Sequence, residues 1–101
     1  MSSDPLDRIR KRFLERCRSD LRRLAELHSS GVYRHDPDAL PMLIGIAHSL
    51  AGAGGTLGFP EISSSAFEFE TLLIERKLDH SATAALGELI ETLKRTLTTS
   101  G

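Results

Sequence analysis

Apolar residues recur at spacings of three and four along most of the chain, which is the period of an amphipathic helix. Short stretches rich in Gly, Pro and Asp separate four such segments, and none of them alternates as a strand would. The pattern predicts helices over about residues 4–29, 38–58, 60–77 and 80–97. Because short connections place successive helices antiparallel, we expect residues 1–101 to form one all-α domain, an antiparallel up-down-up-down four-helix bundle.

Capping residues agree with these limits. Asp4 precedes a proline and can cap the first helix, and Gly31 is typical of the residue that follows a helix. Asp38 is favoured as the cap of the second helix, because Pro41 is tolerated only in a first turn. The tail over residues 98–101 is expected to fray.

Each predicted helix has one apolar face, which we expect to form the core. The single cysteine, Cys17, lies on that face of the first helix, so it is expected to be a small core residue and no internal disulfide can form. The expected inward residues are Leu6, Ile9, Phe13, Cys17, Leu21, Leu24 and Leu27; Leu43, Ile46, Leu50 and Leu57; Ile62, Ala66, Phe69 and Leu73, with Phe67 and Ile74 beside them; and Leu86, Leu89, Ile90, Leu93 and Leu97.

His48 lies roughly opposite the apolar stripe of the second helix when each residue is advanced by about 100°. Small residues surround it on that side, namely Gly45, Ala51, Gly52 and Gly55. An interior helical glycine costs about 1 kcal/mol relative to alanine, so this concentration needs a reason. The simplest reason is access of a large partner to the imidazole. A surface histidine without a role, or a glycine face for close helix packing, remains an alternative.

The segment His48-Ser49-Leu50-Ala51-Gly52, followed by Gly58, Ile62, Ala66 and Phe69-Glu70, resembles the histidine-containing phosphotransfer (HPt) domain. That family has the pattern His-x-Leu-Lys-Gly, a later glycine, and a second helix with Leu-xxx-Ala-xx-Leu-Glu. The resemblance implies a helical bundle in which His48 exchanges a phosphoryl group with the aspartate of a receiver domain. Ala51 stands where the family usually has lysine.

Neutral imidazole is a nucleophile, and phosphoryl transfer depends mainly on positioning and on charge neutralisation, usually with Mg²⁺. The sequence has neither a nucleotide-binding glycine loop nor a convergent carboxylate cluster. We therefore expect a phosphoryl carrier without autonomous kinase activity, which binds no cofactor or metal itself and uses Mg²⁺ held by the receiver.

The resemblance also implies a docking face for the receiver around His48. We expect this face to contain Gly45, Ala51, Gly52 and Gly55, with Ile44 and Leu40 at its edge and Pro41 just above. Two other functions remain open. One is an HPt-like scaffold that binds a receiver but transfers weakly or not at all, and the other is a plain helical adaptor.

Charge is distributed unevenly although the net charge is only −1. Residues 1–34 hold nine Lys/Arg and five Asp/Glu, a net of +4, whereas residues 35–101 hold four and nine, a net of −5. The basic first helix, in which Glu15, Asp20 and Glu26 are interspersed, is either a solvated face or attracted to an acidic protein surface.

The expected partners are response-regulator receiver domains, a hybrid histidine kinase, or both. No nucleic-acid motif is present, and neither a signal peptide nor an apolar run long enough for a membrane span is evident. These observations favour a cytoplasmic monomer that binds neither nucleic acid nor a membrane.

Overall fold

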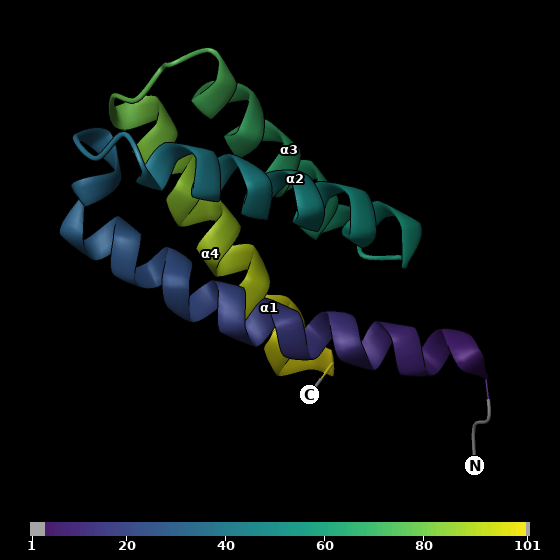
Figure 1. Ribbon diagram of the computed structural model, residues 1–101. Coiled ribbons are helices and arrows are strands. Elements are labelled where there is room, and N and C mark those ends of the chain that lie inside the picture. The colour runs from purple at the N-terminus through teal and green to yellow at the C-terminus, as the bar shows by residue number, and fades with distance from the viewer. Residues whose placement is uncertain (1–3, 101) are drawn as a thin grey trace.

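A computed structural model describes residues 4–100, without the side chains of Val32 and Ser100, and over this range it is helical with no strand. The elements are α1 (Pro5–Ser30), the short 3-10 helix η1 (Val32–Arg34), α2 (Ala39–Thr56), α3 (Pro60–Ile74) and α4 (His80–Ser100). Figure 1 shows α2 and α3 side by side, while α4 packs against both α3 and α1. The prediction of an all-α fold with four helices is therefore confirmed.

Most of the predicted helix ends coincide with observed caps. The side chain of Asp4 accepts a hydrogen bond from the Leu6 amide at 3.0 Å, and Gly31 ends α1 with a φ of 65°. Asp38 precedes α2 as predicted, although its side chain makes no capping hydrogen bond.

Three helix ends differ from the prediction. α2 ends at Thr56 rather than at residue 58. α3 ends at Ile74 rather than near residue 77, because Arg76 takes a left-handed φ of 60°. The Arg76 and Lys77 amides then donate to the carbonyls of Leu73 and Leu72, the Schellman pattern that closes a helix. α4 instead continues to Ser100 rather than ending near residue 97, so residues 98–100 of the tail that was expected to fray belong to the helix, while residue 101 lies outside the described residues.

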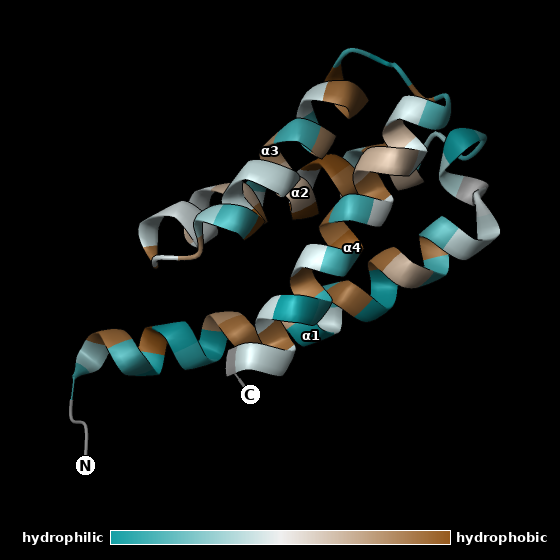
Figure 2. Cartoon of the chain, turned by 180° about the vertical axis from the view of Figure 1, so that it is seen from behind, coloured by the Kyte–Doolittle hydropathy of each residue, from teal (hydrophilic) through white to brown (hydrophobic). Residues whose placement is uncertain are grey.

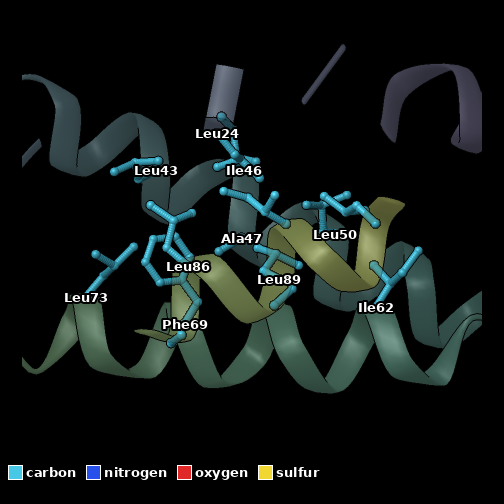
Figure 3. Packing of buried hydrophobic residues seen from close by; sticks show 14 of the residues in the cluster. Leu24, Leu43, Ile46, Ala47, Leu50, Ile62, Phe69, Leu73, Leu86 and Leu89 are labelled. Carbon is cyan, nitrogen blue, oxygen red and sulfur yellow. The ribbon is translucent and has the colours of Figure 1, made fainter. Parts of the chain in front are cut away.

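The core lies between the four helices, as Figure 3 shows with side chains that point inward from α1, α2, α3 and α4. α2 supplies most of one side of it, and α3 and α4 supply the other. The fully buried residues include Leu24, Leu43, Ile62, Phe69, Leu73, Leu86 and Leu89, which were all predicted to face inward.

Two residues predicted to face the core and two placed beside it are instead exposed. The first turns of α1 extend past the end of α4 (Figure 1), which leaves Leu6 39% and Ile9 49% exposed. On α3, Phe67 is 62% and Ile74 58% exposed. These two residues are seven positions apart and therefore share one face, which is turned away from the core.

Asp20 is the opposite case, because it was counted among the solvated charges of α1 but is buried. Its Oδ2 lies 3.6 Å from Arg16 Nε, and within the described part of the chain it has no hydrogen-bond partner. Burial raises the pKa of Asp20. Cys17 is buried and is therefore a core residue, as expected. Burial, together with the nearby Asp20 charge, raises the pKa of its thiol to about 12.

The apolar character of α2 exceeds what we expected from the sequence. By length and composition alone, Ala39–Thr56 would suffice to cross a membrane. In the fold, however, α2 packs mainly against α3, and seven of its residues are buried. Figure 2 shows hydrophobic segments of the helices facing the interior of the molecule, whereas hydrophilic and hydrophobic residues alternate along α1.

Two helical glycines should respond oppositely to alanine. A Cβ at Gly87 would meet only His28 Nε2, at 3.5 Å, whereas one at Gly54 would lie 3.2 Å from the Ser63 amide nitrogen and 3.3 Å from the Phe59 carbonyl oxygen. Gly87→Ala should raise the free energy of unfolding by about 0.5–1 kcal/mol, the usual helical gain. Gly54→Ala should lower it, because overpacking costs about 1–3 kcal/mol. Urea unfolding followed by circular dichroism measures both, and equal effects would contradict the close approach at Gly54.

Candidate functional site

A close approach of α2 and α3 forms the site. Gly54 and Gly55 let the start of α3 lie against the end of α2, where a Cβ at either glycine would be only 3.2 Å from Ser63 atoms. Ser63 Oγ donates to the Ala51 carbonyl oxygen at 2.7 Å, and the Phe59 amide donates to the Gly54 carbonyl oxygen at 2.7 Å. These contacts fix the two helices relative to each other one turn from His48.

His48 and Glu70 meet across this helix pair. His48 Nδ1 lies 2.8 Å from Glu70 Oε2. A carboxylate only accepts hydrogen bonds, so Nδ1 carries the hydrogen and, in the neutral ring, Nε2 holds the lone pair. The His48 side chain is 78% exposed, whereas that of Glu70 is 12% exposed. The arrangement is therefore a well-exposed nucleophilic nitrogen on a ring that a nearly buried carboxylate orients.

An open groove of about 430 Å³ begins at this pair and continues between the two helices. Four of its lining residues are small, and Phe67, which also lines it, is 62% exposed. The lining residues are His48, Ala51, Gly52, Ser63, Ser64, Phe67 and Glu70, none of which is a lysine or an arginine.

The predicted docking residues differ in their surroundings. A Cβ at Gly45 or Gly52 would meet nothing within 4 Å, so both glycines border open space. Gly55 is exposed, but its Cβ position is 3.2 Å from Ser63 Oγ, which makes it part of the α2–α3 contact as well. Ala51 is half-buried. At the edge, Pro41 is exposed and Ile44 is half-buried. Leu40, also expected at the edge, is instead buried in the core.

Sequence reasoning missed two residues of the site. Glu70 had been noted only as part of a family pattern, although that pattern was the signal that could have identified it. Phe67 had been placed beside the core. On a helix it lies three residues before Glu70 and hence on the neighbouring part of the same surface, which the spacing alone could have indicated.

The other histidines lack this arrangement. His28, His35 and His80 are exposed, and within residues 4–100 none of them pairs with a carboxylate. Over the same range, no group of three or more His, Cys, Asp or Glu could hold a metal ion.

Comparison with known proteins assigns the family. The model of one protein family, described as Hpt domain, matches residues 8–99. The search of curated proteins and the search of solved structures gave no match. Hpt domains are histidine phosphotransfer modules of phosphorelays, carriers rather than kinases, and they work with receiver domains and histidine kinases. With a match over almost its whole length and an oriented, exposed histidine at the expected position, the chain belongs to the Hpt domain family.

Proposed function

We propose that the chain is a phosphoryl carrier of a multistep His-Asp phosphorelay, in which His48 exchanges a phosphoryl group with the aspartate of receiver domains. The observation that carries this proposal is the 2.8 Å contact between His48 Nδ1 and Glu70 Oε2, which leaves Nε2 as the exposed nucleophile. The open space at Gly45 and Gly52 supports it, because a whole domain must approach the ring.

In the direction from aspartate to histidine, the Nε2 lone pair attacks the phosphorus of the aspartyl phosphate. A bond forms between Nε2 and phosphorus, the bond between phosphorus and the carboxylate oxygen breaks, and its electron pair stays on the aspartate. The ring becomes positively charged while Nδ1 keeps its hydrogen. Glu70, which accepts that hydrogen, balances the new charge. The reverse reaction returns the phosphoryl group by the same path.

The remaining parts of the reaction belong to the partner in this proposal. Mg²⁺ would be held by the receiver and would neutralise the transferred phosphoryl group there. The receiver would dock over Gly45, Ala51, Gly52 and Gly55, with Ile44 and Pro41 at the edge. We further propose that the carrier acts as a cytoplasmic monomer, and that its four helices alternate in direction, as their short connections favour.

The second candidate is a receiver-binding scaffold with weak transfer. It is favoured by Ala51, since the groove beside His48 has no lysine or arginine of its own to stabilise a phosphoryl group. Labelling distinguishes the two functions, because a scaffold would bind a receiver without acquiring phosphate. We keep the carrier as the main proposal, because the orientation of His48 by Glu70 serves chemistry and is not needed for docking alone.

His48→Gln should fold like the parent, because the side chain is 78% exposed, and should acquire no phosphate. The measurement is incubation with a panel of phosphorylated receiver domains, followed by location of the label. The matched control is the triple variant His28→Gln, His35→Gln and His80→Gln, which should be labelled at the parental level. Labelling of His48→Gln would end the proposal.

Glu70→Ala should slow the labelling of His48 about ten- to hundred-fold, because a hydrogen bond to a charged group contributes about 1.5–3 kcal/mol. Glu70→Gln should slow the labelling less, since its amide oxygen can still accept the hydrogen bond from Nδ1. The initial rate of phosphate uptake from one receiver measures both variants. Parental rates in both would show that Glu70 does not assist His48.

Gly52→Arg should raise the free energy of unfolding by up to about 1 kcal/mol, because glycine is a poor helix former and a Cβ here meets nothing within 4 Å. Its long side chain should nevertheless obstruct the receiver and reduce transfer at least ten-fold. Gly52→Ala should gain most of this stability, and its transfer rate should fall less than that of Gly52→Arg. Ser19→Arg, exposed on α1, controls for the added charge. A parental transfer rate in Gly52→Arg would show that receivers dock elsewhere.

A further inference from the structure

The α2–α3 hairpin that carries the site has an unusual charge composition. Residues 39–74 contain three glutamates and no lysine or arginine, so every positive side chain of the protein lies outside this segment. A phosphoryl group on Nε2 would itself carry a charge of about −1.5 to −2 at pH 7, which the positive charge gained by the ring offsets only in part. The phosphorylated site would then be strongly anionic, with no fixed cation on either helix that forms it.

The groove beside His48 is the place where such a cation is missing. Ala51 lies one turn after His48, and its small side chain leaves open the volume that a lysine at this position would fill. The groove is instead lined by the Glu70 carboxylate, the Phe67 ring and serine hydroxyls. Negative charge and an exposed aromatic ring together favour an ammonium or guanidinium group, which is attracted to both.

We propose that this groove receives a lysine or arginine side chain of the receiver, which neutralises the phosphoryl group in trans. The inference rests on the proposed function, since it needs a docked receiver. Charge complementarity identifies the occupant: the hairpin offers only negative charge, and the Phe67 ring is 62% exposed at the side of the groove. The inserted cation forms no covalent bond and leaves the bond-making and bond-breaking at Nε2 unchanged.

The groove also explains how docking and chemistry would be coupled. The isolated domain lacks the cation, so its phosphohistidine is stabilised only when the correct partner is bound. An electrostatic contact of this kind also speeds association, and it weakens as salt screens it. A partner without the cation would dock on the same face but gain little from the phosphoryl group.

Two substitutions at position 51 separate charge from volume. Ala51→Lys fills the groove and supplies the cation in cis, whereas Ala51→Met fills it without charge. Both should reduce kcat/KM for transfer to a receiver that labels the parent, by about ten-fold. Only Ala51→Lys should lengthen the lifetime of phosphohistidine in the isolated domain, and only its transfer should lose the dependence on salt between about 50 and 300 mM.

Phe67→Leu provides a test that does not disturb the half-buried position 51, because Phe67 is largely exposed. It keeps an apolar side chain but removes the ring, so kcat/KM should fall about two- to five-fold if a cation lies against the ring. Ser19→Lys on α1 adds a positive charge away from the groove and should behave as the parent. This variant and the salt dependence of the parent decide the question even if both variants at position 51 unfold.

Several results would overturn the inference. Parental transfer in Ala51→Met would show that nothing enters the groove. A second contradictory result has three parts. Transfer by the parent would not depend on salt, kcat/KM would fall equally in Ala51→Lys and Ala51→Met, and kcat/KM would not fall in Phe67→Leu. Together these would show that an uncharged side chain enters the groove instead. These outcomes require labelled His48 and so leave the proposed function intact. Absence of His48 labelling by every receiver would instead overturn both proposals.

Discussion

The hydrogen bond between His48 and Glu70 depends on how closely α3 approaches α2. Glu70 can reach Nδ1 because Gly54 and Gly55 admit the start of α3 to within van der Waals contact of α2. Ser63 then fixes the approach by donating to the Ala51 carbonyl oxygen. The glycines therefore have two distinct roles, since Gly54 and Gly55 serve packing, whereas Gly45 and Gly52 leave space around the ring.

The same constraint separates the stable part of the molecule from the reactive part. Leu43, Ala47 and Leu50 of α2 are buried in the core, and they hold the opposite face of the helix, with His48, toward solvent. A histidine on a loop would need its position fixed by many local contacts. Here the helix fixes it, and one carboxylate suffices to set the orientation of the ring.

Much of this could be predicted from the sequence because it depends on local rules. The period of apolar residues predicted the four helices. Asp4 and Gly31 indicated the ends of α1, because capping depends on a side chain or a backbone conformation within a few residues of the helix end. The end of α3 could not be predicted this way, since Arg76 takes a left-handed conformation that usually favours glycine.

Tertiary contacts account for the other errors. Asp20 occupies an inward position of α1, where a polar residue was assigned to solvent by its type alone. Phe67 and Ile74 were placed beside the inward positions because they are apolar, yet both are largely exposed on α3. The position of His48 followed from the spacing of small residues around it. Its pairing with Glu70 depends on the α2–α3 register, which periodicity within one helix does not determine.

Charge adds a final level of organisation. The positive side chains are concentrated on α1, while the α2–α3 hairpin has only negative ones. α1 touches the hairpin where Arg10 Nε donates to the Leu57 carbonyl oxygen at 2.9 Å, but no side chain of α1 lines the groove beside His48. Because exposed charges are screened over about 8–10 Å in physiological salt, basic side chains that do not line the groove contribute little to neutralising a phosphoryl group on His48. The reactive face therefore has to obtain its positive charge from whatever docks on it, so recognition of the phosphorylated form and selection of the partner become the same electrostatic event.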